Sequence, residues 1–496
     1  MKKAITVLLV LCMLLSLTVA CAQQEKPDDT TPVSALPEET QAQEETPDLP
    51  DEKFDGYEFR VLVTGNFQNN DFAVTEGAED PVNNARYIWL SGLEEKFDVK
   101  LSQDAQIKFG STTGNGPGYS AVQMINKTQE PSYDACMIGT YDVAKLALPG
   151  YLYDLNSLDY VDLSRSWWDQ KANEDLMIQG KMFYTTGDIS LTDNIVTHCI
   201  LFNKELMRQT TSENLYDLVR AGKWNFEKLS ELVMLVSEDV NGDDRMDASD
   251  KYGLLTWNDS MLQILGAGRE RICTVNKNGD IELSLYNDRT VSIYEKYTTL
   301  AYNGKYVINY QIEPNNPMSA TPVATWDPTR DAIFNEGRAL FYMSVFTAVA
   351  RHRDSDVDFG ILPFPLMTEE QKEYGHQVSA YHCQFLCVPY YIGNAKITGT
   401  VLEYLAYTGK KLITPAYAEK TLVGTQFRDE ESGDMLDVIS ASRVYDVGIY
   451  YGVPYRDQLI ALFKNRTVAL SALYERLKNS TQVLIDRIND SFAKLG

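Results

Sequence analysis

The sequence predicts an α/β protein of two lobes, each a doubly wound sheet flanked by helices. With 496 residues, the chain is too long for one ordinary hydrophobic core. An apolar, β-prone run at 59–63 is followed by a helical pattern over 84–97 and by an extended segment at 99–101. This strand, helix, strand order is typical of the opening of a parallel sheet. Similar alternation recurs along the chain, which predicts the same architecture throughout.

Two later segments complete the predicted elements. An Asn-Gly turn lies between the β-prone runs 272–275 and 281–285, which predicts a hairpin that decorates the second lobe. From 471 to 492 the apolar residues recur at helical spacing, which predicts a helix packed on a lobe.

The N-terminus predicts export and lipid attachment. Two lysines precede an apolar run that ends at Ala20, which is the layout of a secretory signal. The segment 17–21, LTVAC, resembles a bacterial lipobox, with Thr18 where Leu is more usual. We therefore expect residues 1–20 to be a signal peptide and Cys21 to carry the lipid that holds the protein on the outer face of the cell membrane. The alternative is one membrane helix, for which this run is at the short limit.

Residues 21–53 predict a disordered acidic tether. They are rich in Pro, Glu, Asp and Thr and contain almost no large apolar side chain that could offset the entropy cost of ordering. The whole chain carries a formal net charge of −25. A field of that sign disfavours nucleic acid and anionic membranes as partners and favours a neutral ligand.

Five cysteines lie beyond the predicted tether, an odd number without metal-type spacing. We expect no disulfide framework. Cys383 and Cys387 flank a segment that is typical of a buried strand, where cysteine acts as a small apolar residue.

A calcium-like loop spans residues 239–250. Oxygen-bearing side chains occupy loop positions 1, 3, 5, 9 and 12, and the carbonyl at position 7 would add a ligand. Position 6, usually glycine, is Asp244, which tolerates the left-handed conformation at modest cost. The predicted ligands of a structural calcium ion are Asp239, Asn241, Asp243, Arg245 through its carbonyl, and Asp250. The alternative is an acidic, solvated turn.

No local catalytic signature occurs in the sequence. We find no Gly-x-Ser-x-Gly elbow, no His-Glu-x-x-His and no phosphate-binding Walker loop. The sequence therefore predicts a protein that is not an enzyme. A surface glycoside hydrolase stays open as an alternative, because its two carboxylates can come from distant segments.

Several phrases, in this order, resemble one protein family. They are YD at 133–134 with GTY at 139–141, LYDL at 152–155, WWD at 167–169, GKMFY at 180–184, LFNK at 201–204, the loop running into KYG at 251–253, FNEGRALF at 334–341 and FGILP at 359–363. The order resembles that of the bacterial extracellular solute-binding proteins of family 1, which include maltose-binding protein.

The resemblance implies an architecture and a role. It implies two lobes joined by hinge strands, which close on a solute and deliver it to the membrane permeases of an ABC importer. It places lobe I at 54–193 and 340–395, and lobe II at 194–339 and 396–496. It also implies a carbohydrate ligand. A peptide ligand, and a sensory role in place of import, stay open.

The resemblance also implies which residues face the ligand. A sugar site needs aromatic rings for the C–H faces of the sugar, together with carboxylates and amides for its hydroxyl groups. The residues implied at the cleft are Asn66, Tyr141, Asp188, Trp257, Phe346 and Tyr445.

Overall fold

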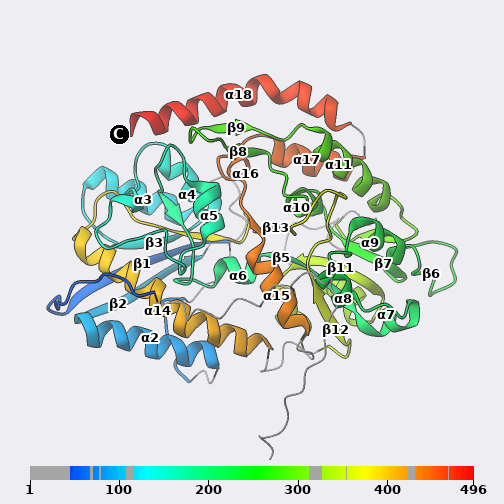
Figure 1. Cartoon of the computed structure of the whole chain (residues 1–496), viewed down its shortest axis with the longest axis horizontal. Coiled ribbons are helices and arrows are strands. Elements are labelled where there is room, and N and C mark those ends of the chain that lie inside the picture. The colour runs from blue at the N-terminus through cyan, green and yellow to red at the C-terminus, as the bar shows by residue number, and fades with distance from the viewer. Residues whose placement is uncertain are drawn as a thin grey trace, which may run out of the picture. The chain divides into compact units, whose positions relative to one another are not determined.

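The computed structural model describes most of the chain beyond the N-terminal segment. Described are residues 45–66, 71–77, 80–107, 116–311, 327–353, 355–422, 431–466 and 469–495. The predicted signal peptide, Cys21 and most of the predicted tether lie outside these residues. Residues Thr46–Gly496 form one compact unit (Figure 1). Over the described ranges, no helix combines the length and the apolar character that a membrane span requires.

The predicted tether ends earlier than residue 53. Residues 46–53 belong to the compact unit, where Leu49 packs against the hydrophobic core and Glu52 forms an ion pair with Lys396. This corrects the prediction of disorder up to residue 53. The apolar side chain of Leu49, next to that of Phe54, supplies the burial that the preceding acidic stretch lacks.

The first sheet contains five strands in the order β2-β1-β3-β14-β4. Its strands are β1 (Tyr57–Gly65), β2 (Val99–Ile107), β3 (Ala135–Gly139), β4 (Tyr184–Thr185) and β14 (Gln384–Cys387). Strand β1 runs parallel to β2 and β3, whereas β14 runs antiparallel to β3 and β4. The helices of this lobe are α2 (Pro81–Phe97), α3 (Pro117–Thr128), α4 (Thr140–Ala147), α5 (Gln170–Leu176), α6 (Thr192–Val196) and α14 (Ala395–Leu422). Helices α2 and α14 lie side by side along this lobe (Figure 1).

Helix α2 shows how the sequence sets these boundaries. The Asp80 carboxylate accepts hydrogen bonds from the backbone N–H groups of Val82 and Asn83, and a proline occupies the first turn. The helix ends at Asp98, which adopts the left-handed conformation. The predicted helix over 84–97 is confirmed, and it begins three residues earlier because of this cap.

The second sheet has the order β10-β7-β11-β5-β12, with β6 paired to β7. Its strands are β5 (His198–Asn203), β6 (Ser237–Glu238), β7 (Lys251–Thr256), β10 (Val307–Asn309), β11 (Ala339–Val345) and β12 (Phe359–Leu362). The helices around it are α7 (Lys204–Thr210), α8 (Leu215–Arg220), α9 (Phe226–Val233), α10 (Ser260–Ala267), α11 (Asp288–Ala301), α12 (Asp327–Asn335), α13 (Thr347–His352) and α15 (Glu431–Ala441). Strands β7, β10 and β11 run parallel, and β5 runs antiparallel to β11.

The expected lobe boundaries are wrong at two places. Residues 340–395 were expected in lobe I, but β11 and β12 hydrogen bond within the second sheet. Residues 396–496 were expected in lobe II, but α14 packs against α2 of the first lobe. The crossing from the second sheet to the first thus follows β12, because β11 and β12 both pair with β5.

Three chain segments lie side by side between the two sheets and form the hinge. The first, at 196–198, leads from the first sheet into β5, and the second, at 376–379, leads from β12 toward β14. The third, at 442–444, follows α15. Strands β13 (His376–Gln377) and β15 (Arg443–Val444) pair in parallel, and backbone hydrogen bonds of 2.8–3.2 Å join the second segment to the other two.

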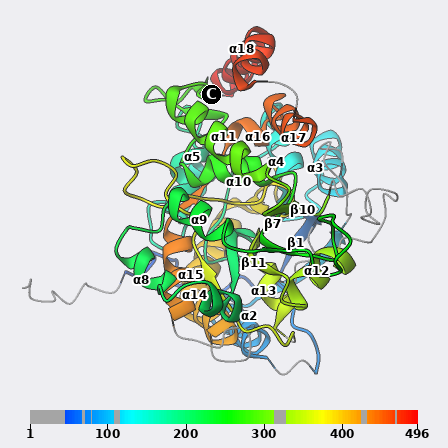
Figure 2. The same ribbon diagram turned by 90° about the vertical axis from the view of Figure 1, so that its right-hand side faces the viewer.

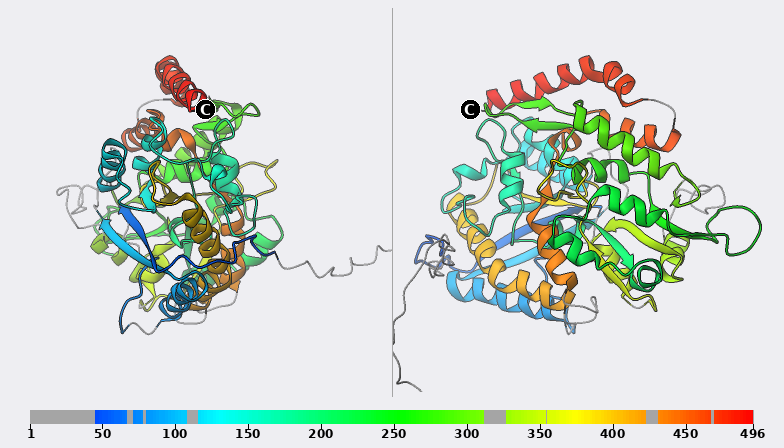
Figure 3. Two further views of the ribbon diagram at one scale, coloured as in Figure 1. Left: turned by 90° about the vertical axis from the view of Figure 1, so that its left-hand side faces the viewer. Right: turned by 45° about the vertical axis from the view of Figure 1, so that its right-hand side comes forward.

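The C-terminal helices pack beside the predicted hairpin. The hairpin is confirmed as β8 (Cys273–Val275) and β9 (Ile281–Leu283), and it lies next to α18 (Leu470–Lys494). Helices α16 (Val447–Tyr450) and α17 (Tyr455–Asn465) precede α18. Two further views show α18 lying along the outside of the unit, next to α11 and the hairpin (Figures 2 and 3). The predicted helix over 471–492 is confirmed.

Candidate ligand-binding site

Both sheets turn the carboxyl ends of their parallel strands toward the hinge. Strand β14 is antiparallel to β3, so the hinge segment that leads into β14 enters at the edge where β1 and β3 end. Strand β5 is antiparallel to β11, so the segment leading into β5 enters where β7, β10 and β11 end. Open α/β sheets bind their ligands at this edge. The two edges therefore define one candidate site between the lobes.

Four of the six predicted ligand-binding residues follow these strand ends directly. Asn66 follows β1 and Tyr141 follows β3 in the first lobe, whereas Trp257 follows β7 and Phe346 follows β11 in the second. All four side chains are buried. The structure thus gives these four residues equivalent positions at the two facing sheet edges.

Tyr141 is in contact with helix α17. The guanidinium group of Arg456, on α17, lies over the Tyr141 ring at 4.8 Å from its centre. Burial raises the pKa of the Tyr141 hydroxyl, Arg456 opposes this, and the charge of Asp259 adds to it. Asp259 lies between β7 and α10, so the ring has charged groups of both signs near it.

Trp257 lies in an aromatic cluster with an unused hydrogen-bond donor. Its ring lies 6.3 Å from the rings of His198 and Tyr310, measured between centres. Its indole N–H has no hydrogen-bond partner among the described residues, although it is buried. The centre of the Phe346 ring lies 6.4 Å from that of the Tyr417 ring on α14. This contact joins the second lobe to the first.

The two histidines near these strand ends are neutral at physiological pH. Burial lowers the pKa of His198 to about 3 and that of His382 to about 4, and the charges of Arg351 and Arg330 add to the effect on His382. The His198 Nδ1 lies 2.6 Å from a backbone carbonyl in the hinge. Neutral imidazoles suit a neutral polar ligand better than an anion.

Asp188 and Tyr445 belong to a separate buried cluster. The Tyr445 hydroxyl donates a hydrogen bond of 2.8 Å to Asp169, and Arg443 forms ion pairs of 3.0 Å with Asp169 and 3.2 Å with Asp193. The Asp188 carboxylate accepts a hydrogen bond from a threonine hydroxyl of α14. These contacts hold Tyr445 to Asp169 and Asp188 to α14, and the role of both residues in ligand binding stays a prediction.

This cluster holds the hinge to the first lobe. Arg443 lies in hinge strand β15, and its carboxylate partners come from the segments before α5 and within α6. Burial raises the pKa of Asp193 to about 7, and Arg443 opposes the rise. A buried cation with two carboxylates is costly to separate, so this contact fixes one end of the hinge.

The predicted calcium ligands make local hydrogen bonds within their own loop. Their oxygens accept local backbone hydrogen bonds, including two to each of Asp239 and Asp250. Throughout the described part of the chain, no group of three or more His, Cys, Asp or Glu side chains is placed to hold a metal ion. Asp244 adopts the expected left-handed conformation, with φ of 63°. Calcium binding stays a prediction. A lower melting temperature in chelator would support it, and an unchanged one would contradict it.

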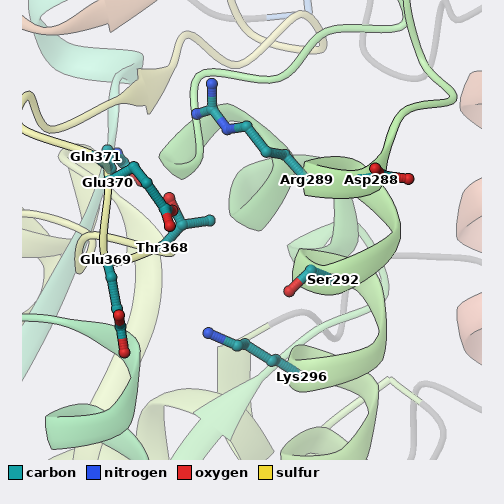
Figure 4. Close-up of a pocket in the computed structure, with 8 residues that line it drawn as sticks. All are labelled: Asp288, Arg289, Ser292, Lys296, Thr368, Glu369, Glu370 and Gln371. Carbon is teal, nitrogen blue, oxygen red and sulfur yellow. The ribbon is translucent and has the colours of Figure 1, made fainter.

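Two surface pockets lie apart from the strand ends. One, of about 440 Å³, lies between α11 and residues 368–371 (Figure 4). Its two cations already pair elsewhere, Arg289 with Glu270 and Lys296 with Glu227. The other, of about 870 Å³, lies between residues 156–180 and the turn of the β8–β9 hairpin. None of the predicted ligand-binding residues lines either pocket.

Sequence analysis missed Asp259, Arg456 and Tyr381. Asp259 lies two residues after Trp257, so the loop after β7 was a local signal that could have led to it. Arg456 is more than 300 residues from the Tyr141 ring that it covers, and no local pattern relates the two. Tyr381, which is among the groups that raise the pKa of Tyr141, lies in the second hinge crossing, between β13 and β14.

Comparison with known proteins rests on structure. No family model matches the chain, and no curated protein matches it in sequence. A galacto-N-biose/lacto-N-biose I-binding protein of an ABC transporter from Bifidobacterium longum matches with a TM-score of 0.56 and 10% identity, over 88% of this chain and 98% of that one.

Two other solved structures are similar. An ABC substrate-binding protein from Listeria monocytogenes in complex with cycloalternan has a TM-score of 0.51 and 11% identity, over 88% and 100% of the two chains. UgpB from Mycobacterium tuberculosis in complex with glycerophosphocholine has a TM-score of 0.50 and 13% identity, over 82% of this chain and 95% of that one. The chain therefore has the two-lobed α/β fold of these ABC transporter binding proteins.

Proposed function

We propose that this protein is the solute-binding component of an ABC importer and that it captures a carbohydrate between its two lobes. One observation carries the proposal. The ends of parallel strands from both sheets meet at the hinge, and each contributes buried aromatic or amide side chains, among them Asn66, Tyr141 and Trp257. Aromatic rings with neutral hydrogen-bonding groups are the side chains that a sugar requires.

The proposed role extends to the membrane. After export, the lipid on Cys21 would anchor the chain to the outer face, and membrane permeases would receive the ligand. The fold neighbours are binding proteins, and we propose that this protein likewise binds its ligand without converting it.

A thermal-shift screen tests the ligand class. The purified protein is melted with maltotetraose, lacto-N-biose, cycloalternan, glycerophosphocholine and short peptides. A ligand at a thousand times its Kd stabilises the protein by about 4 kcal/mol, which is a rise of several degrees. A shift with a saccharide that chromatography recovers intact is the expected result. A shift with peptides or glycerophosphocholine alone, or consumption of the sugar, would contradict the proposal.

Trp257 offers a direct test of the site. We expect Trp257→Ala to weaken saccharide binding by roughly 10- to 100-fold, because the ring supplies the apolar wall. The control is Tyr87→Ala, which removes an exposed ring on α2. Calorimetric titration measures both. Equal affinities in Trp257→Ala and the wild type would place the ligand elsewhere.

A further inference from the structure

Helix α10 presents buried polar groups that have no partner in the described part of the chain. The Gln263 side chain is 1% exposed, and neither its oxygen nor its nitrogen has a hydrogen-bond partner within the described structure. Leaving a buried amide unpaired costs about 1–3 kcal/mol for each group. Such an amide is rare in a folded core and points to a partner that binds there.

The position of Gln263 relates it to the candidate site. Asp259, Gln263 and Gly266 follow one another on one face of the helix, at spacings of four and three residues. At one end of this face, Asp259 is among the charged groups that act on Tyr141. At the other end, Gly266 lies against Gln377 of the hinge, so close that a methyl group there would lie 2.8 Å from the Gln377 side chain. Gln263 therefore lies between the Tyr141 ring and the hinge.

Asp259 has an unused carboxylate. It precedes α10 but does not cap it, since its side chain accepts no hydrogen bond from the first turn. Burial raises the pKa of Asp259, and the charge of Arg456 opposes the rise. No ion pair joins the two among the described residues. Arg456 itself lies over the Tyr141 ring. A hydroxyl group between these charges would donate to Asp259 and accept from Arg456.

We propose that Asp259, Gln263 and Arg456 form a diol-binding subsite against the Tyr141 ring. This inference rests on the proposed function and deepens it, because it names the ligand group that is recognised: two neighbouring hydroxyl groups of a neutral sugar. A carboxamide and a carboxylate each bind such a pair with two hydrogen bonds. A ligand that carries this pair would give partners to the Gln263 amide, which has none among the described residues. Arg456 already pairs with Asp457 at 2.9 Å through one nitrogen, so its other nitrogens would serve the ligand.

Two buried glutamines make a matched test. Gln371 is also buried, but its amide accepts from Met367 N–H and donates to two backbone carbonyls. We expect Gln263→Met to weaken binding of the best saccharide of the screen by about 10- to 100-fold and to raise the melting temperature of the ligand-free protein by roughly 1–3 °C. Gln371→Met should lower that melting temperature and leave the affinity unchanged.

Deoxy sugars complete the test. Monodeoxy derivatives of that saccharide are titrated into wild type, Gln263→Met and Asp259→Asn. Loss of one particular hydroxyl should weaken binding to the wild type by about 10-fold and have little further effect on the variants. Wild-type affinity in both variants would overturn the subsite and leave sugar capture standing. Failure of the wild type to bind any saccharide would overturn the proposed function and the subsite together.

Discussion

The buried carboxyl group of Glu403 holds two tryptophan side chains in the first lobe. It lies on α14, is 1% exposed, and accepts hydrogen bonds of 3.0 Å from the indole N–H groups of both Trp167 and Trp168. The tryptophan pair thus packs in the first lobe. Burial raises the pKa of Glu403 to about 7, against these hydrogen bonds.

The raised pKa predicts a pH-dependent stability. The folded carboxyl stays protonated up to about pH 7, whereas the unfolded one ionises near 4.5. The contribution of the protonated Glu403 carboxyl to the free energy of unfolding is therefore fully present below pH 4.5. It is lost as the pH rises through 7. Glu403→Gln should remove this part of the pH dependence, on the order of 2 kcal/mol between pH 5 and pH 8.

Urea unfolding at the two pH values measures the effect. The control is Glu95→Gln, whose side chain is exposed on α2. The free energy of unfolding should fall less with pH in Glu403→Gln than in the wild type or the control. The same fall in all three proteins would contradict the role of Glu403.

At the scale of elements, the packing of α14 depends on a glycine. A methyl group at Gly409 would lie 2.0 Å from the backbone oxygen of Asp188, so the helix contacts that segment through its bare backbone. Helix propensity alone predicts that Gly409→Ala stabilises the protein by about 1 kcal/mol. We expect the clash with the Asp188 oxygen to outweigh the gain in helix propensity, so that the free energy of unfolding of Gly409→Ala falls by about 2–4 kcal/mol.

Gly304 provides the control for this prediction. A methyl group there meets nothing within 4 Å. Gly304→Ala should therefore change the free energy of unfolding by less than about 0.5 kcal/mol. Denaturant midpoints compare both variants with the wild type. A more stable Gly409→Ala protein would show that α14 does not pack as closely as described.

Local sequence patterns predicted individual helices and strands. Their positions in the fold depend on pairing between strands that are far apart in the sequence. The strand at 59–63, the helix at 84–97 and the hairpin around Asn278–Gly279 follow from spacing and turn residues, which neighbours in the sequence determine. The sheet to which β11 and β12 belong depends on β5, more than 130 residues earlier. An apolar run does not reveal its pairing partner, and the boundaries that the family resemblance implied placed both strands in the wrong lobe.

The same limit applies to the site. The family resemblance locates strand ends, and Asn66, Tyr141, Trp257 and Phe346 do follow strand ends in the structure. That they bind the ligand stays a prediction. Asp188 and Tyr445 were expected there too. The Tyr445 hydroxyl donates to Asp169, which also pairs with Arg443 of the hinge, and Asp188 accepts from a threonine of α14. Side chains that meet only through the fold, such as Arg456 over Tyr141, leave no local pattern.

At the scale of the whole molecule, the proposed capture depends on closure of two lobes about a hinge of three segments. Closure would keep the strand-end residues of both lobes buried around the ligand, which would pair their unused hydrogen-bond groups. A ligand shifts such an equilibrium only by its differential affinity for the closed state. Sugar binding and a shorter interlobe distance should therefore occur together.

The distance between the lobes is the most direct measurement of this claim. The five cysteines of the described chain are buried, so nitroxide labels at Lys100→Cys on β2 and Lys223→Cys after α8, both exposed sites, report one distance by pulsed electron resonance. Adding a saturating amount of the saccharide from the thermal screen should shift the distance distribution to shorter values, and the Trp257→Ala protein should need more sugar for the same shift. An unchanged distribution at a sugar concentration that calorimetry shows to be saturating would contradict capture by closure.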